Sequence, residues 1–149
     1  MDSDSVSGGE PGRLDMVAVE AGLTVLFDAW ERAVGDLGGT VPGTQLRALL
    51  MVDRADGLDL SQLATEMGAS HHATSSLCDQ MEVAGLLMRV WGIGGHRTVL
   101  RATRAGKRLA AWIRDRRREA LRGVLSSMRP SDARDALARG LTDLAAGAG

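Results

Sequence analysis

The sequence has little of what marks secreted, disulfide-bonded or membrane proteins. Its one cysteine, Cys78, permits no internal disulfide, which favours a reducing compartment and hence the cytoplasm. No apolar run approaches the length that spans a membrane, and the acidic start, Met-Asp-Ser-Asp-Ser, is unlike a signal peptide. Lys107 is the only lysine among 18 basic residues, a bias that a GC-rich gene would also produce. We expect a cytoplasmic protein that does not bind a membrane.

The chain also lacks the arrangements of side chains that catalysis or cofactor binding needs. The glycine-rich stretch WGIGGHRTVLR, residues 91–101, is not a phosphate loop, because His96 and Arg97 stand where Lys and Ser or Thr are required. It does not match the dinucleotide fingerprint either, since the spacing and the surrounding βαβ unit are missing. The adjacent His71 and His72 point apart and have no evident third ligand for a metal. With no triad and no paired carboxylates, we expect no enzyme, no metal and no cofactor.

Length and composition indicate one globular domain. A chain of 149 residues, 44% hydrophobic and 25% charged, is long enough to bury a core of its own. Residues 1–12 are rich in Ser, Gly, Asp and Pro and are expected to form a disordered tail. Residues 13–149 are expected to form the single domain.

The net charge of −1 hides an uneven distribution along the chain. Residues 1–88 contain 4 basic and 14 acidic residues, a balance of −10, whereas residues 89–149 contain 14 basic and 5 acidic residues, a balance of +9. The basic excess is densest in residues 89–122, with 11 basic against 2 acidic residues. Such a stretch is usually a solvated helix face, and an anion-binding surface is the alternative.

Long amphipathic helices are predicted at both ends of the domain. The first covers about residues 13–37, where apolar side chains recur every three or four positions: Met16, Val19, Leu23, Leu26, Trp30, Ala33 and Leu37. Further apolar residues widen this stripe, so the helix needs cover on more than one side, which favours a partner subunit. Residues 105–146 are predicted to hold two more helices, separated by Arg129-Pro130, with Ser131 capping the last one.

Between these ends, two short helices follow a predicted helix over about residues 44–55. Asp59 and Gln62 form an approximate capping box at the start of the first short helix. A turn at Gly68-Ala69-Ser70 leads to the second, from about His71 to Ala84, with Ser70 placed as its cap. Two short helices joined by a tight turn containing Gly are typical of a helix-turn-helix, although such pairs also occur in proteins that bind no nucleic acid.

Two strands are predicted directly after the helix pair, at Leu86–Trp91 and Thr98–Thr103. A strand pair in this position is a wing, and the winged lobe is expected to cover about residues 44–103. The glycine-rich stretch between the strands is then the wing tip, and Arg97 is its cation. The alternative is an ordinary hairpin turn.

At this point the chain resembles the MarR family of winged-helix transcription regulators. The resemblance covers nearly everything after residue 13. It is carried by Leu63-Ala64 in LSQLATEMGAS, by MEVAGLLMR at residues 81–89 and by RATRAG at residues 101–106. The family's usual Asp-x-Arg at the wing tip is replaced here by Gly95-His96-Arg97. The resemblance implies a mainly α winged helix-turn-helix fold with a short β-hairpin wing and long N- and C-terminal dimerisation helices.

The family also implies partners. Members are homodimers clasped by their first and last helices, with the second helix of each helix-turn-helix in a DNA major groove and the wing along the minor groove. Many members release double-stranded DNA when a small, often aromatic, molecule binds between the dimerisation helices and the DNA-binding lobe. We therefore expect a homodimer, a DNA partner and a small aromatic ligand.

Candidate site residues follow from these placements. If Thr74, Leu77, Cys78 and Met81 face inward, the side chains predicted to contact DNA are His71, His72, Ser75 and Ser76 on the helix and Arg89, Arg97 and Arg101 on the wing. Arg101 is expected to face Arg89 across the hairpin, and both are alternatively solvated charges. Asp79 adds a repulsive charge to the helix. Phe27, Trp30 and Trp112 are candidates for a ligand pocket, with a place in the core as the alternative.

The function predicted from the sequence is therefore DNA-binding transcriptional regulation. We expect a homodimeric repressor of a palindromic operator, released by a small-molecule ligand. The rival hypothesis is a winged-helix module that binds a protein without sequence-specific DNA binding, because the second helix of the pair contains no Lys or Arg.

Overall fold

Helices dominate the computed structural model, which describes residues 15–35, 41–91 and 98–147. The elements in chain order are α1 (Met16–Gly35), α2 (Gly43–Arg54), α3 (Leu60–Met67), α4 (His71–Val83), β1 (Leu87–Trp91), β2 (Thr98–Ala102), α5 (Arg104–Ser127) and α6 (Ser131–Gly147). This order confirms the predicted fold class, a mainly α winged helix-turn-helix with long helices at both ends. Ser131, expected as a cap, is already the first residue of α6.

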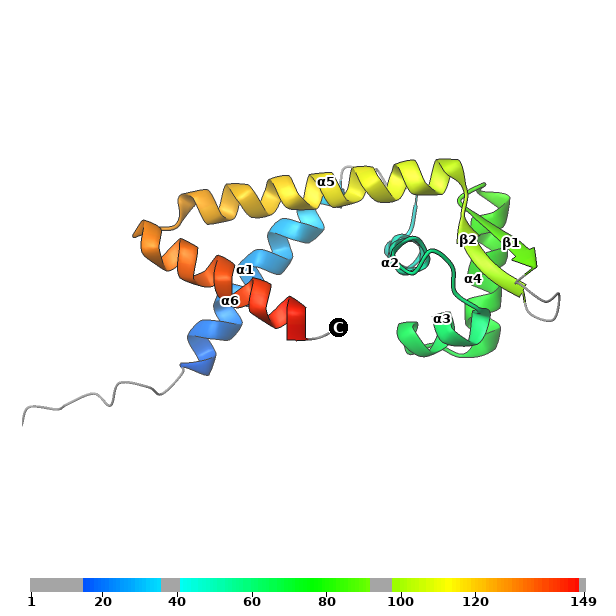
Figure 1. Ribbon diagram of the computed structural model, residues 1–149, viewed down its shortest axis with the longest axis horizontal. Helices are drawn as coiled ribbons and strands as arrows, with labels where there is room; N and C mark the ends of the chain where they lie inside the picture. Colours follow the sequence, from blue (N-terminus) through cyan, green and yellow to red (C-terminus); the bar gives the residue numbers. More distant parts are fainter. Residues whose placement is uncertain (1–14, 36–40, 92–97, 148–149) are drawn as a thin grey trace, which may run out of the picture.

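A single long helix organises the molecule (Figure 1). α5 runs along most of its length, with α2, α3, α4 and the hairpin gathered at its N-terminal end and α1 and α6 lying toward the other. We call the group of α2, α3, α4 and the hairpin the winged lobe. A junction of Val34, Leu46 and Ile113 packs α1, α2 and α5 together, so the winged lobe is anchored to the long helices by a small apolar cluster.

The core of the winged lobe draws one or more side chains from every one of its elements. Leu49 of α2, Leu63 of α3, Met81 of α4 and Leu100 of β2 are almost completely buried and belong to one cluster. Burying four such side chains contributes about 1.5–3 kcal/mol each, which is the main source of stability for a lobe this small. The orientation of α4 is therefore fixed by packing against all its neighbours.

The hairpin has a defined register and a short third strand. β1 and β2 pair antiparallel from Leu87 opposite Ala102 to Trp91 opposite Thr98. On the other side of β2, the backbones of Leu58 and Leu100 exchange hydrogen bonds of 3.1 and 2.8 Å. Gly57, just before, has a φ of +130°, and a Cβ there would lie 2.8 Å from Val99 Cγ1. Only glycine therefore allows the chain to meet β2 at this point.

The long terminal helices leave much apolar surface uncovered in the single chain. Ala29 and Val34 are the buried residues of α1, and both lie outside the stripe predicted from its periodicity. By contrast Met16, Val17, Leu23, Val25 and Phe27 are each more than half exposed. α6 contains no buried residue among those described. Part of the predicted stripe is packed, since Leu26 and Ala33 are half-buried, but apolar residues occupy more than one face of this helix and most of them stay exposed.

Candidate nucleic-acid interface

The helix-turn-helix is built by local capping interactions. The Asp59 carboxylate accepts a hydrogen bond from the backbone N–H of Gln62, and the Gln62 side chain accepts one from the backbone N–H of Asp59, at 2.8 and 3.0 Å. Gly68 ends α3 in the left-handed conformation with a φ of +64°. Ser70 then caps α4 by accepting a 3.2 Å hydrogen bond from the N–H of Ala73. All three features were predicted from the sequence, and together they set the angle between α3 and α4.

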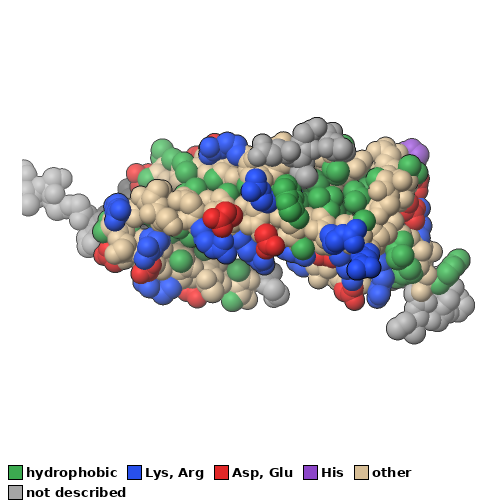
Figure 2. All heavy atoms as spheres, turned by 90° about the horizontal axis from the view of Figure 1, so that it is seen from above, with side chains coloured by type: hydrophobic (Ala, Val, Ile, Leu, Met, Phe, Trp, Pro, Cys, Tyr) green, Lys and Arg blue, Asp and Glu red, His purple; other side chains and the backbone are tan. Residues whose placement is uncertain are grey.

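α4 has a buried face and a polar outer face. Thr74, Cys78 and Met81 are buried, as predicted, and Leu77 is half-buried. On the other side His71, His72 and Ser76 are exposed and Ser75 is half-buried. Figure 2 shows a histidine side chain on the surface at the end of the molecule that carries the winged lobe. The polar groups available to a partner are therefore imidazoles and hydroxyls, which donate and accept hydrogen bonds, together with the exposed carboxylate of Asp79.

The two hairpin arginines do not face each other. Arg89 lies opposite Leu100, and Arg101 lies opposite Met88. The predicted pairing was wrong by one residue, and because side chains alternate along a strand, the two arginines project from opposite faces of the hairpin. Arg101 is exposed and approaches Asp56 at 3.9 Å, whereas Arg89 turns toward α4.

Arg89 contacts two carboxylates of α4. Its guanidinium lies 2.7 Å from Asp79 Oδ1 and also forms an ion pair with Glu82. The hydrogen bond with Asp79, supported by the charge of Glu82, raises the pKa of Arg89 above its already high ordinary value. Asp79, expected to add a repulsive charge to the helix, is therefore paired. Sequence analysis missed this cluster, although Glu82 and Arg89 both lie in the MEVAGLLMR segment.

Arg97 and His96, at the predicted wing tip, lie outside the described residues. The strands that lead into and out of the tip are described, with Trp91 opposite Thr98 as their last pair. Trp91 is 77% exposed, so the described part of the wing ends with a large apolar side chain on its surface.

A second set of residues missed by sequence reasoning joins the wing to α5. Thr103 caps α5 by accepting a 3.0 Å hydrogen bond from the N–H of Gly106, and its hydroxyl donates to the Gly85 carbonyl at 2.6 Å. A Cβ on Gly106 would lie only 2.1 Å from the Leu86 carbonyl oxygen. The glycine therefore lets the first turn of α5 pack directly against the backbone where α4 leads into β1. The sequence signal for this contact was the Thr-x-x-Gly spacing in RATRAG.

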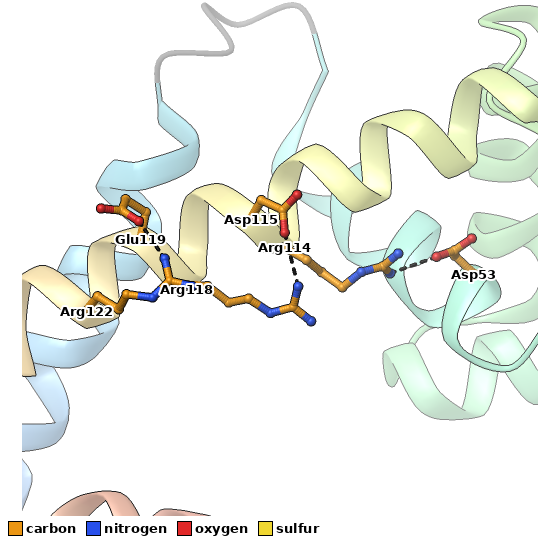
Figure 3. Close-up of polar contacts among 6 residues, drawn as sticks. All are labelled: Asp53, Arg114, Asp115, Arg118, Glu119 and Arg122. Carbon is orange, nitrogen blue, oxygen red and sulfur yellow. Dashed lines mark hydrogen bonds and ion pairs between the residues drawn. The ribbon is translucent and has the colours of Figure 1, made fainter.

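The surface of α5 carries many cations, most of them paired within the protein (Figure 3). Arg114 reaches across to Asp53 of α2 with a distance of 2.7 Å, while Arg118 and Arg122 pair with Asp115 and Glu119 on α5 itself. Figure 2 likewise shows Lys and Arg side chains along one face of the molecule, interspersed with acidic ones. The sequence suggested a solvated helix face for the basic run in residues 114–118. Arg116 and Arg118 are exposed there, whereas Arg114 and Arg117 are half-buried.

A cavity of about 1030 Å³ lies between α1, α2 and α5. Phe27 and Trp30 line it, whereas Trp112, the third predicted pocket residue, is not among its lining side chains and instead contacts Arg116. Arg117 also lines the cavity, with its guanidinium 4.5 Å from the centre of the Trp30 ring and Glu31 at 4.0 Å. Burial lowers the pKa of Arg117, and the Nε atom is buried without a hydrogen-bond partner.

The described ranges hold neither a metal-binding cluster nor a membrane-spanning helix. Residues 15–35, 41–91 and 98–147 contain no group of three His, Cys, Asp or Glu side chains that could hold a metal ion. None of the helices described is both long and apolar enough to cross a membrane.

Comparison with known proteins agrees with this architecture. The model of the MarR family matches residues 40–97, which cover the helix-turn-helix and the first part of the wing. No curated protein matches the sequence.

Solved structures are similar over most of the chain. RV1404 from Mycobacterium tuberculosis has a TM-score of 0.77 at 22% identity, covering 95% of this chain and 99% of its own. A MarR family protein from Bacillus stearothermophilus has a TM-score of 0.73 at 21% identity, covering 89% and 91%. The transcriptional repressor CouR, bound to a 23-mer DNA duplex, has a TM-score of 0.61 at 22% identity, covering 89% and 92%. At these identities the likeness establishes the fold.

Proposed function

We propose that this chain is a member of the MarR family, whose model matches its winged-helix segment, and that it is a homodimeric DNA-binding repressor that acts in the cytoplasm and is released by a small ligand. Family membership supports a DNA-binding transcriptional regulator without enzymatic activity. The observation that carries the proposal is the outer face of α4, where His71, His72 and Ser76 are exposed beside a wing. A solved relative of this fold is a repressor bound to DNA.

Dimer formation is supported by the uncovered apolar surface of the terminal helices. Side chains such as Val17, Leu23 and Phe27 on α1 and Leu144 on α6 are more than half exposed in the single chain. Contiguous apolar surface of this kind marks an association site in a monomeric structure. Obligate homodimers bury large apolar interfaces and often have no stable folded monomer.

The dimer is tested by sedimentation at micromolar concentration. We expect a dimer for the wild type, and a shift toward unfolded or aggregated chains when Leu23 and Leu144 are both replaced by Glu. The matched control replaces Thr65 and Ser61 of α3, which are exposed away from these helices, by Glu. A well-folded wild-type monomer would overturn the proposal.

The DNA site is proposed to be an inverted repeat. A twofold dimer imposes its symmetry on the duplex, with half-site centres about one helical turn apart. Selection of bound duplexes from a random pool should recover such a palindrome. Recovery of no enriched sequence would favour the rival function, a module that binds a protein through the same lobe.

The wing is proposed to contact DNA through charge, whereas α4 is proposed to discriminate between base sequences. Arg97 is proposed to enter or skirt the minor groove, where the negative potential attracts a guanidinium. Arg97→Ala should make the slope of log K against log salt shallower by roughly two units per dimer, because two phosphate contacts are lost. His72→Ala should reduce discrimination between sequences with little change in slope. Arg139→Ala, on the exposed helix α6, is the control. If Arg97→Ala gives the same slope as this control, the wing is an ordinary hairpin turn that does not contact DNA.

The cavity between the winged lobe and the long helices is the proposed ligand site. Five arginines and two acids line it, so its wall carries a balance of +3 beside the rings of Phe27 and Trp30. Arg117 has a buried Nε without a partner and rests on Trp30. Since a buried cation gains from a nearby anion, a flat aromatic anion is the ligand class that fits these walls.

Calorimetry with benzoate and benzamide tests this ligand class. The two probes share a ring and differ in charge, so we expect the anion to bind measurably more tightly. Arg117→Leu should remove that preference, and Arg122→Leu, whose side chain is not among those lining the cavity, should keep it. Equal binding of both probes to the wild type would contradict the assignment.

A further inference from the structure

The cluster of Arg89, Asp79 and Glu82 connects the wing to α4 by three separate interactions. The Arg89 guanidinium forms ion pairs with Asp79, at 2.7 Å, and with Glu82. The backbone N–H of Arg89 also donates to Glu82 Oε1 at 3.0 Å. Glu82 therefore holds both the main chain and the side chain of the same wing residue.

Strand pairing explains why that backbone N–H is available. Arg89 lies opposite Leu100, whose own N–H and carbonyl bond to Leu58 on the far side of β2. Leu100 therefore makes no hydrogen bond to Arg89. In an antiparallel ladder, a residue in such a non-hydrogen-bonded pair directs its own N–H away from the partner strand. The Arg89 N–H points toward α4, where Glu82 accepts it. The edge of β1 is thus closed by a side chain of α4 rather than by another strand.

Charge makes this arrangement relevant to DNA. α4 contains no Lys or Arg, and Asp79, with a side chain 62% exposed, lies on the outer part of the helix with Ser75 and Ser76. An unpaired carboxylate there would repel phosphates. Arg89 brings a positive charge to Asp79, while its own side chain stays only 33% exposed and is occupied by two acids. A phosphate would have to compete with both carboxylates for the same guanidinium.

We infer that Arg89 is a positioning residue, which fixes the wing against α4 and neutralises Asp79, and that it does not bind a DNA phosphate. This inference rests on the proposed DNA-binding function. A planar guanidinium can serve two carboxylates in fixed directions, whereas an ammonium is a single point charge. The forked contact sets the separation between the helix that reads the major groove and the wing that follows the minor groove.

The experiment compares two variants whose DNA affinities should change differently if Arg89 positions the wing than if it binds a phosphate. Arg89→Lys keeps the charge but loses the fork, so affinity for the duplex selected by the wild type should fall roughly tenfold, the scale of one lost specific contact. The Asp79→Asn/Glu82→Gln variant should also lose roughly tenfold on that duplex, although it carries fewer negative charges. If Arg89 were a phosphate ligand, Arg89→Lys would retain most of the affinity and removal of the acids would increase it. Either of these results would overturn the inference.

A matched control and a second measurement separate this inference from the proposed function. Asp56→Asn removes an acid that pairs with Arg101 of β2 and Lys107 of α5 without touching the cluster, and the affinity of this variant should stay the same or rise slightly. Hydrogen exchange without DNA should accelerate in residues 87–91 of the Asp79→Asn/Glu82→Gln variant and not in Asp56→Asn. Unchanged exchange would contradict the positioning role. If exchange accelerates but the protein selects no DNA, the positioning role of Arg89 is supported and the proposed DNA-binding function is rejected.

Discussion

Replacing Gly106 by alanine tests the contact that sets the wing against the long helix. The added Cβ would lie 2.1 Å from the Leu86 carbonyl oxygen and 3.1 Å from Leu49 Cδ1. An ordinary contact begins at about 3.4 Å, so the two backbones must separate by roughly 1.3 Å. The Leu86 carbonyl also accepts a hydrogen bond from the N–H of Thr103 at 3.1 Å, and that bond would be strained by the same movement.

The magnitude follows from three opposing effects. Overpacking at a rigid contact costs about 3 kcal/mol, at the upper end of its usual range, because the obstacle is backbone. A weakened hydrogen bond costs about 1 kcal/mol. Alanine in place of a helical glycine returns about 1 kcal/mol. The free energy of unfolding should therefore fall by about 3 kcal/mol, which corresponds to a decrease in Tm of roughly 6–12 °C for a chain of this length.

Thermal and urea unfolding at one fixed protein concentration measure this effect. Gly123→Ala in the same helix is the control, because a Cβ there meets nothing within 4 Å, and its Tm should stay or rise slightly. Affinity for the selected duplex should also fall in Gly106→Ala, since Leu86 lies where α4 leads into the wing. A Gly106→Ala protein as stable as the Gly123→Ala protein would refute the reasoning.

Three further experiments test individual side chains. Asp59→Ala removes the cap of α3 and should lower the free energy of unfolding by about 1 kcal/mol, and an unchanged urea midpoint would show the capping box to be dispensable. Arg114→Leu removes the partner of the nearly buried Asp53 carboxylate and should lower the free energy of unfolding by about 1–2 kcal/mol, after allowance for the exposure of the arginine. The double variant Asp53→Asn/Arg114→Leu should recover part of that loss. Cys78 is fully buried and burial raises the pKa of its thiol, so iodoacetamide at pH 8 should label it only in urea, and rapid labelling of the native protein would contradict its placement.

Local sequence signals predicted the parts of the site that local interactions build. The capping box at Asp59 and Gln62, the turn at Gly68 and the cap at Ser70 each join residues no more than three or four positions apart. Their hydrogen bonds join groups that are close together in the chain, so their spacing alone is informative. The inward set on α4 was predictable for the same reason, because helical periodicity places Thr74, Cys78 and Met81 on one face.

Long-range packing decided the features that the sequence left open or predicted wrongly. The position of Arg101 relative to Arg89 depends on strand register, and a shift of one residue reverses the face of every side chain. That register places Leu87, Leu100 and Ala102 together on the face that joins the core of the winged lobe, and this core includes residues from α2, α3 and α4. The exposed apolar side chains of α1 have the same origin, because periodicity does not say which of its apolar residues α5 will cover.

The sequence by itself determined the fold class, the order of the elements and the polar face of α4, since these depend on periodicity, turns and caps within short segments. Only the tertiary structure decided that Arg89 pairs with Asp79 and Glu82, that Gly106 contacts the Leu86 backbone and that Trp112 stays out of the lining of the cavity. Each of these outcomes depends on the distance between two backbones brought together by the core. No spacing within one segment specifies that distance, because it is set by the packing of side chains from several helices and strands at once.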